Sequence, residues 1–171
     1  QPQDGNPRPR CFRLQKDQAI INRMGINNKG VMHALNQLKS KPRDLVVAAS
    51  LSKNAKTPNE TAYKDYERSF SLLYDFVDFF VLNVSCPNVK DVTELQDIAL
   101  LSEIIDRLNA IRRYNDEERP IRIKVSPDIP IEQLDAIVEL ELVSGIEGIV
   151  ATHTTRSRAT LTTSKAALAE I

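Results

Sequence analysis

The sequence predicts an α/β fold in which parallel strands alternate with helices. Four short apolar runs, at 45–49, 79–82, 121–123 and 148–151, are separated by amphipathic helical segments. Strands connected in this way pair in parallel through right-handed crossovers. The runs do not alternate between apolar and polar residues, so we expect the sheet to be buried on both faces.

Two architectures fit this pattern, an open doubly wound sheet and a closed (β/α)₈ TIM barrel. Each run ends at a polar residue, and these residues are Ser50, Asn83, Lys124 and Thr152. Ligands bind at the carboxyl ends of the strands in both architectures, so we expect the four side chains to point into one site. A Rossmann-type sheet carries a glycine-rich phosphate loop after its first strand, and this sequence has none there. We therefore predict the TIM barrel.

Helix and turn signals assign the rest of the chain. The expected elements are a loop at 1–10, hairpin strands at 11–14 and 19–21, and helices at 31–39, 58–76, 98–111, 131–142 and 165–171. Pro42 terminates the first of these helices because proline lacks the backbone N–H that a helix needs. The charged residues at 112–119 are typical of a solvated helix end.

The composition indicates an ordinary soluble protein. Of the 171 residues 42% are hydrophobic, and 23 basic side chains balance 23 acidic ones. This balance predicts no nucleic-acid partner. Two cysteines and two histidines, with no Cys-x-x-Cys pair, predict a reducing compartment and no metal site. Without a signal peptide or long apolar run the chain is expected to be cytoplasmic. Neither end resembles a natural terminus, so we expect a fragment.

The most distinctive segment follows the second apolar run and has the sequence Asn83-Val-Ser-Cys-Pro-Asn88. One interpretation is a polar turn, since proline and asparagine are common turn formers. In a functional interpretation, Asn83 and Asn88 offer amide groups to a planar polar ligand. The thiol of Cys86 lies between them, and a thiol has a reference pKa of about 8.5 that nearby donors or positive charge lower. Cys86 is therefore a candidate general base or nucleophile.

Six segments resemble the dihydroorotate dehydrogenases in family order. The segment 83–88 is similar to their Asn-x-Ser-[Ser/Cys]-Pro-Asn motif. Ile21-Asn-Arg-Met-Gly-Ile-Asn-Asn28 resembles the Ile-Asn-Arg-Met-Gly-Phe-Asn-Asn signature of the quinone-linked class 2 members. The other similar segments are 3–13, 53–58, 123–128 and 149–155. The resemblance implies that residues 1–171 are the central part of a single FMN-binding barrel domain without its first and last strands.

The resemblance also implies an oxidoreductase of pyrimidine synthesis that converts (S)-dihydroorotate to orotate with FMN. Cys86 would remove the C5 proton while hydride leaves C6 for the flavin N5, and Lys124 would stabilise the reduced flavin. The residues implied to contact FMN are Ser50, Asn83, Lys124 and Thr152. Those implied to contact the substrate are Asn22, Arg23, Met24, Gly25, Ile26, Asn83, Asn88, His153 and Thr154.

Three residues depart from the class 2 pattern. Cys86 stands where class 2 enzymes have serine and soluble class 1 enzymes have cysteine. Ser50 replaces an asparagine that binds the flavin, and His153 replaces an asparagine that helps to bind the pyrimidine ring. Three alternatives follow: a dihydroorotate dehydrogenase, a flavin oxidoreductase for another dihydropyrimidine-like ring, and a non-catalytic barrel that binds a ligand or has a structural role.

The electron acceptor has two candidates. The class 2 motifs favour a membrane quinone, with the full-length protein held on the inner face of the cell membrane by a segment outside this chain. The cysteine favours a soluble acceptor. The oligomeric state stays open, with a homodimer among the alternatives. In this family the flavin phosphate is bound mainly by loops after the last two barrel strands. We therefore expect residues 1–171 alone to bind FMN poorly and to be inactive.

Overall fold

A computed structural model describes residues 1–42, 44–86 and 96–171. A four-stranded parallel sheet contains β3 (Ala48–Leu51), β4 (Phe79–Asn83), β5 (Ile121–Lys124) and β6 (Ile149–Val150), in that order. An antiparallel hairpin is formed by β1 (Cys11–Leu14) and β2 (Ala19–Asn22), as the sequence predicts. The helices are α1 (Val31–Leu38), η1 (Asn59–Thr61), α2 (Tyr63–Leu73), η2 (Tyr74–Phe76), α3 (Ile98–Arg112), α4 (Ile131–Ser144) and α5 (Lys165–Ala169).

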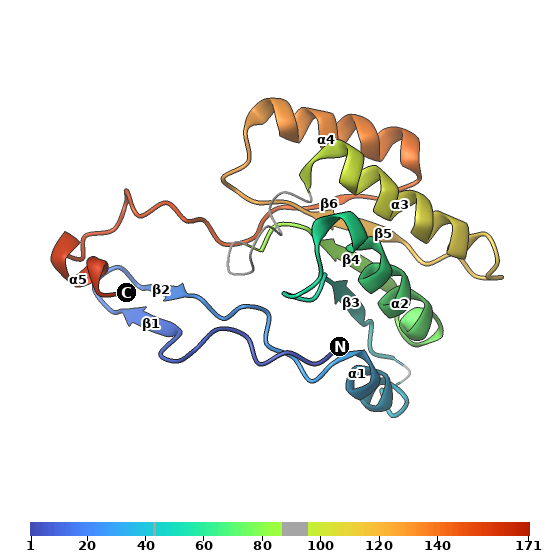
Figure 1. Cartoon of the computed structure of the whole chain (residues 1–171), viewed down its shortest axis with the longest axis horizontal. Coiled ribbons are helices and arrows are strands. Elements are labelled where there is room, and N and C mark those ends of the chain that lie inside the picture. The colour runs from blue at the N-terminus through green and yellow to red at the C-terminus, as the bar shows by residue number, and fades with distance from the viewer. Residues whose placement is uncertain (43, 87–95) are drawn as a thin grey trace.

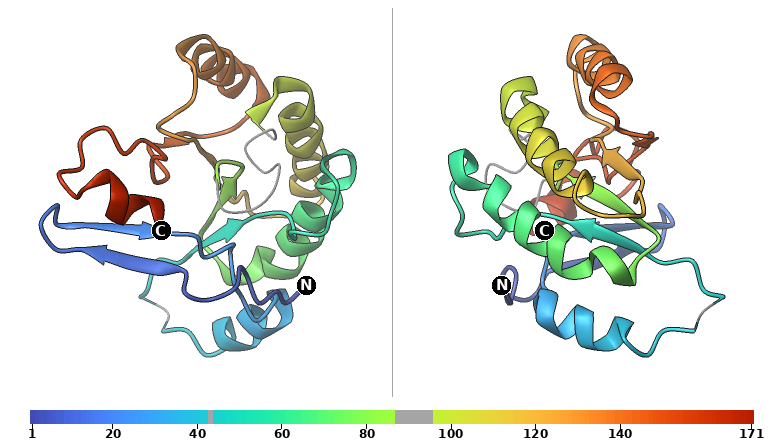
Figure 2. Two further views of the ribbon diagram at one scale, coloured as in Figure 1. Left: turned by 60° about the vertical axis from the view of Figure 1, so that its left-hand side comes forward. Right: turned by 90° about the vertical axis from the view of Figure 1, so that its right-hand side faces the viewer.

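The order of the strands distinguishes the two predicted architectures. A doubly wound sheet reverses its strand order at a switch point. The four described strands instead lie side by side in the order in which they occur along the chain. In the left view of Figure 2, helices α1 to α4 follow one another in an arc around these strands. This is the arrangement of consecutive strand–helix units in a (β/α)₈ barrel.

The core lies between the sheet and the helices. The register pairs Phe80 with Ile121 and Leu82 with Ile123, and all four side chains are fully buried. They pack against helix residues that include Phe70, Tyr66, Leu101, Ile105 and Leu108. Burying an aliphatic or aromatic side chain of this size contributes about 1.5–3 kcal/mol. This layer therefore fixes which face of each strand points away from the helices.

The prediction that both faces of the sheet are buried holds for β4, where Phe80, Val81 and Leu82 are all buried, but not for β3 and β5. Burial in β5 alternates, since Ile121 and Ile123 are buried whereas Arg122 is exposed. Ser50 is exposed on the same side of the sheet as Arg122, because Val81 pairs with both. Arg122 lies over the ring of Phe79 at 4.6 Å. On the inner face of β5, Arg122 and Lys124 alternate with the buried isoleucines, whereas the same face of β4 carries Phe79 and Val81 before Asn83.

The first strand begins later than expected. Leu45 and Val46 are 53% and 72% exposed, and β3 starts only at Ala48. The backbone of Val47 is instead bound by Asp78, whose carboxylate accepts from Val47 N at 2.7 Å and whose N–H donates to Val47 O at 2.8 Å. As a consequence Ser50 lies within β3, whereas the sequence pattern placed it directly after the strand.

The loop at 1–10 packs along the segment that follows the hairpin. Gln3 and Asn28 exchange two backbone hydrogen bonds of 3.0 and 2.9 Å. At Gly5, with φ of 76°, a Cβ atom would lie only 2.2 Å from Met24 O, so this approach requires glycine. The N-terminal loop therefore supports the segment 23–28 from one side.

The C-terminal segment returns to the hairpin. Asp17, in the hairpin turn, accepts hydrogen bonds from the N–H and hydroxyl groups of both Thr162 and Thr163. Chiefly because of the two hydroxyl donors, the pKa of Asp17 falls to about 2. Figure 1 shows α5 lying beside β1 and β2, away from the parallel sheet.

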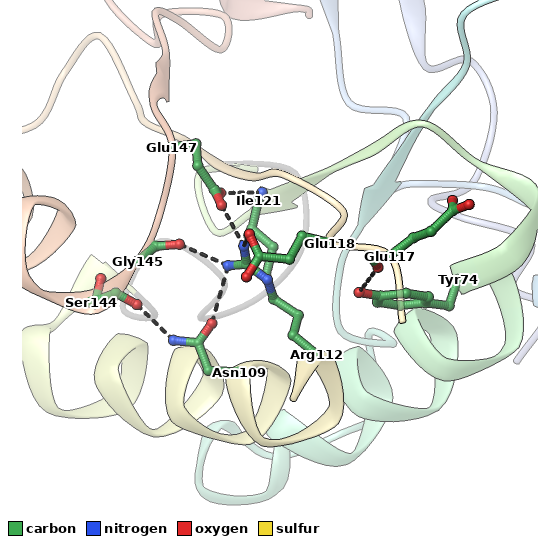
Figure 3. Close-up of polar contacts among 9 residues, drawn as sticks. All are labelled: Tyr74, Asn109, Arg112, Glu117, Glu118, Ile121, Ser144, Gly145 and Glu147. Carbon is green, nitrogen blue, oxygen red and sulfur yellow. Dashed lines mark hydrogen bonds and ion pairs between the residues drawn. The ribbon is translucent and has the colours of Figure 1, made fainter. Parts of the chain in front are cut away.

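The prediction of a solvated charge cluster at 112–119 is wrong for Arg112. This side chain is 9% exposed and donates to Gly145 O at 2.7 Å and Asn109 Oδ1 at 3.2 Å (Figure 3). It also donates to the carboxylate of Glu147. The physical reason is that the chain leaving α4 folds back over the last turn of α3.

No helix among the described residues is long and apolar enough to span a bilayer.

Candidate functional site

Polar side chains gather at the carboxyl ends of the central strands. Asn83 pairs with Lys124, and Lys124 pairs with Val150, so the three residues form one row across β4, β5 and β6. Residues paired in register share a face of the sheet, and this row is on the face away from the helices. Asn83 is 8% exposed, and Lys124 is half-buried. Two of the four polar residues singled out in the sequence therefore lie next to one another.

Cys86 lies three residues beyond the end of β4. Its side chain is 3% exposed and packs against Ile26. This contact brings the 83–86 segment together with the 22–26 segment, although more than fifty residues separate them in the sequence. The two motifs that the sequence marked as most distinctive thus meet at the edge of the sheet.

The charges of the site act on one another. Burial lowers the pKa of Lys124, and the charge of Cys86 in its thiolate form opposes this shift. Burial also lowers the pKa of His153, with the positive charge of Lys124 as the next cause. Lys124 therefore lies within electrostatic range of both Cys86 and His153. The positive charge of Lys124 favours the thiolate form of Cys86, which is the reactive form, whereas burial of the thiol against Ile26 opposes it.

The loop after β6 carries His153. Its backbone N–H donates to Val125 O at 3.0 Å, which extends the pairing of β5 and β6 beyond the strands. The N–H of Thr154 donates to Nδ1 of His153 at 2.7 Å. Nδ1 therefore carries no proton and the neutral imidazole has its proton on Nε2. Thr152 and Thr154 are both exposed in the same loop.

The segment 22–26 has an unusual backbone. Gly25 is buried with φ of 74°, and a Cβ atom there would lie 2.8 Å from Asn6 N. Ile26 has φ of 51°, which costs of order 1–3 kcal/mol for a residue other than glycine. Asn22 Oδ1 accepts from Met24 N at 3.4 Å. This tight turn is what directs Ile26 onto Cys86.

Two of the residues that the family resemblance implied lie apart from this cluster. The guanidinium group of Arg23 donates to Pro9 O at 3.1 Å and to Ile171 O at 3.0 Å, and it lies over the ring of Phe12. It is directed toward the hairpin and the C-terminal segment. Ser50 lies one layer below the Asn83–Lys124 row and lines a cavity of about 210 Å³ together with Lys53 and Ile26.

Asn88 lies outside the described residues, so its part in the site stays a prediction. Among residues 1–42, 44–86 and 96–171, no group of three or more His, Cys, Asp or Glu side chains is arranged to hold a metal ion. The described site therefore offers amide, hydroxyl, thiol, imidazole and ammonium groups around one edge of the sheet.

The sequence interpretation missed three residues that hold the site together. The hydroxyl of Tyr66, which is fully buried in α2, donates to Asn83 O at 3.2 Å. Gln96 is 4% exposed and its Oε1 accepts from Ser126 N at 3.0 Å. Asp128 accepts two hydrogen bonds from the loop after β6. Tyr66 gave no signal because an aromatic residue on an apolar helix face looks like any core residue.

The fold defines an α/β-barrel protein, and its candidate functional site lies at the carboxyl ends of the strands, where barrels of this kind bind their ligands. The family model described as "Dihydroorotate dehydrogenase" matches residues 1–170. The chain therefore belongs to the dihydroorotate dehydrogenase family.

Curated relatives agree with this assignment. The chain is 44% identical over 157 residues to a "Dihydroorotate dehydrogenase (quinone)" of Christiangramia forsetii, covering 92% of this chain and 46% of the relative. It is 40% identical over 161 residues to a protein of the same name from Coxiella burnetii, again covering 92% of this chain and 46% of the relative. The chain thus spans less than half the length of these relatives.

Solved structures of DHODH from Eimeria tenella have the same fold. The structure in complex with ferulenol is 29% identical and has a TM-score of 0.85, covering 94% of this chain and 49% of that chain. The ligand-free structure is 30% identical, with a TM-score of 0.87 and coverage of 96% and 52%. The prediction of a (β/α)₈ barrel, of which this chain is a part, is confirmed.

Proposed function

We propose that the protein containing this chain oxidises (S)-dihydroorotate to orotate with FMN, and that Cys86 is the catalytic base. The observation that supports this most strongly is the buried position of Cys86 against Ile26, within electrostatic range of Lys124. A base must be held in a defined position next to the carbon it deprotonates. Contact with Ile26 limits the movement of the thiol, and Lys124 favours its charged form.

Three residues of the chain have separate roles in the proposed reaction. Cys86 takes the proton from C5 of the substrate and becomes a neutral thiol. Asn83 holds the polar edge of a planar ring with its amide group. Lys124 compensates negative charge that develops in the site. FMN, when bound, supplies the two-electron acceptor that the amino acids of this site lack.

Four polar side chains, three from the inner face of the sheet and one from the loop after β6, are the proposed contacts of the flavin ring. Asn83 and Lys124 offer an amide and an ammonium group from neighbouring strands. Thr152 adds a hydroxyl from the loop after β6, and Ser50 offers a second hydroxyl from within β3. We assign these four residues to the cofactor, within a single FMN-binding barrel domain to which residues 1–171 contribute the central part.

The substrate residues belong to three segments. Asn22, Met24, Gly25 and Ile26 come from the turn after β2, Asn88 from the loop after β4, and His153 and Thr154 from the loop after β6. Asn83 contacts substrate as well as cofactor. Arg23 takes part through its backbone, since its guanidinium group is bound to Pro9 and Ile171.

A quinone is the proposed electron acceptor, because the relatives from Christiangramia forsetii and Coxiella burnetii bear the name "Dihydroorotate dehydrogenase (quinone)". A membrane quinone requires the full-length protein to lie on the surface of the membrane. Cysteine in place of serine at position 86 leaves this proposal open to a direct test with soluble acceptors.

His153 favours a second candidate function, the oxidation of a different dihydropyrimidine-like ring. An asparagine offers a ring both a donor and an acceptor. Nδ1 of His153 is bound to Thr154, so the imidazole offers only its Nε2–H. A site built for paired hydrogen bonds discriminates strongly against a ligand that leaves one unmade.

Anaerobic titration of the full-length flavoprotein distinguishes these functions. Dihydroorotate is added without an acceptor, and the visible absorbance of the flavin is recorded. We expect the flavin absorbance to bleach. An unchanged flavin spectrum with dihydroorotate, followed by bleaching with another dihydropyrimidine, would establish the second candidate. A full-length protein that contains no flavin would contradict both.

A further inference from the structure

We propose that Asp128 is a positioning residue, which fixes the substrate-binding loop after β6 by clasping it to the loop after β5. This inference rests on the proposed function, because the loop after β6 carries His153 and Thr154. Asp128 itself lies four residues beyond Lys124 and touches neither substrate nor cofactor in this account.

The clasp continues where the backbone pairing of the two strands stops. Val125 N donates to Val150 O at 3.3 Å, and His153 N donates to Val125 O at 3.0 Å. Beyond this point the two segments are connected by hydrogen bonds to the side chain of Asp128. One oxygen of Asp128 accepts from the Thr155 hydroxyl at 2.5 Å, and the other accepts from Arg156 N at 2.7 Å.

The two bonds restrain the loop in both position and direction. A carboxylate that binds adjacent residues with its two oxygens fixes the peptide unit between them. Thr155 directly follows Thr154, so the restraint acts next to the proposed substrate contacts. The Thr155 hydroxyl is the main cause of a lowered pKa of Asp128, followed by the N–H of Arg156. The side chain is therefore a carboxylate at neutral pH, as two donors require.

The clasp extends to a third loop. Ser126 N donates to Oε1 of the buried Gln96, which lies just before α3. The Asp128 N–H in turn donates to the Ser126 hydroxyl at 3.1 Å. Loops that follow β4, β5 and β6 are thus joined in series by Gln96, Ser126 and Asp128. Each of these loops or strand ends carries a proposed site residue.

Replacement of Asp128 in the full-length flavoprotein tests this inference. We expect Asp128→Ala to raise KM for dihydroorotate by roughly ten- to hundred-fold, because misplacing a contact by about 1 Å has effects of this size. Asp128→Asn keeps an acceptor for the Thr155 hydroxyl but loses the acceptor for Arg156 N. Its KM should therefore lie between that of the parent and that of Asp128→Ala. Asp135→Ala, on the exposed side of α4, is the matched control and should leave KM unchanged.

Trypsin provides a readout that does not depend on turnover. Cleavage after Arg156 requires the loop to leave its position, so Asp128→Ala should be cut faster at this bond than the parent and Asp135→Ala. A purely global loss of stability would instead accelerate cleavage at all sites and lower the unfolding midpoint. Asp128→Ala and Thr155→Ala share the contact between the two side chains, so their effects should not be additive. In the double variant, Thr155→Ala should add only the loss of the 2.9 Å bond from Ser157 N to the Thr155 hydroxyl.

The outcomes separate this inference from the proposed function. If dihydroorotate does not bleach the flavin of the parent protein, the proposed function fails, and the trypsin comparison still tests the clasp. If the parent is active but Asp128→Ala matches Asp135→Ala in KM and in cleavage after Arg156, the positioning role of Asp128 is wrong.

Discussion

Arg112 and Glu147 join the last turn of α3 to the chain that enters β6 (Figure 3). The second oxygen of Glu147 accepts from Ile121 N at 2.6 Å, at the first residue of β5. These contacts lie at the amino ends of the strands, opposite the candidate site. They fix the positions of the amino ends of β5 and β6. At their carboxyl ends, β5 carries Lys124 and β6 leads into the loop with His153.

Arg112→Ala should destabilise the protein strongly. The substitution leaves Gly145 O without its donor and removes the charged partner of Glu147. Because Arg112 is buried but the Glu147 side chain is 38% exposed, we expect a cost of about 1–3 kcal/mol. The free energy of unfolding in urea measures this cost. Arg113→Ala removes the neighbouring, exposed arginine and should change stability by less than about 0.5 kcal/mol. Equal effects of the two substitutions would show that the Arg112 contacts carry no stability.

Tyr66→Phe should lower the stability of the protein, because Tyr66 binds the backbone at the end of β4. The variant keeps the buried ring but leaves Asn83 O without the hydroxyl donor, which costs about 1–3 kcal/mol. Burial raises the pKa of Tyr66, so the hydroxyl remains a neutral donor at any pH at which the enzyme is assayed. Thermal unfolding of Tyr66→Phe and of Tyr63→Phe, a half-buried tyrosine on the same helix, provides the comparison. A loss no larger in Tyr66→Phe would contradict this account.

His153 should make substrate binding depend on pH. Its pKa is lowered, first by burial and then by Lys124, so the imidazole is neutral at pH 7. Because the folded-state pKa is depressed, the cost to stability is absent above the ordinary value of 6.5 and grows as pH falls through the lowered pKa. Protonation of Nδ1 also removes the acceptor for Thr154 N.

We therefore expect KM for dihydroorotate to rise as pH falls through the lowered pKa of His153, which lies below the ordinary value of 6.5. His153→Asn should remove this rise, since an amide does not titrate, and should lower KM by restoring a paired donor and acceptor. His33→Asn, on the exposed face of α1, is the control. A pH profile of His153→Asn that matches the parent would show that another group is responsible.

Local patterns predicted the strand–helix alternation because each helix and strand buries one apolar face. Apolar residues recur at helical spacing from Ile98 to Ile111, and α3 covers 98–112. Burial of the inner face could not be predicted in the same way. Arg122 and Lys124 alternate with buried isoleucines, yet the sequence Ile-Arg-Ile-Lys does not say which neighbours cover each side.

The site was predicted from motifs, whereas its supports depend on tertiary contacts. Residues 83–86 and 22–26 were recognised as short polar patterns, and the contact of Cys86 with Ile26 joins them. Tyr66, Gln96 and Asp128 act through hydrogen bonds to backbone groups of other loops. Such partners are set by the positions of whole elements, so composition and spacing carry no sign of them.

The rate at which dihydroorotate bleaches the flavin in anaerobic stopped flow tests the role of Cys86 most directly. Cys86→Ala should slow this step by about 10²–10⁴-fold, the usual contribution of a positioned base. Cys86→Ser should keep part of the rate, and Cys11→Ala, at the exposed hairpin cysteine, should match the parent. A Cys86→Ala variant that bleaches as fast as the parent would contradict the assignment of Cys86 as the base.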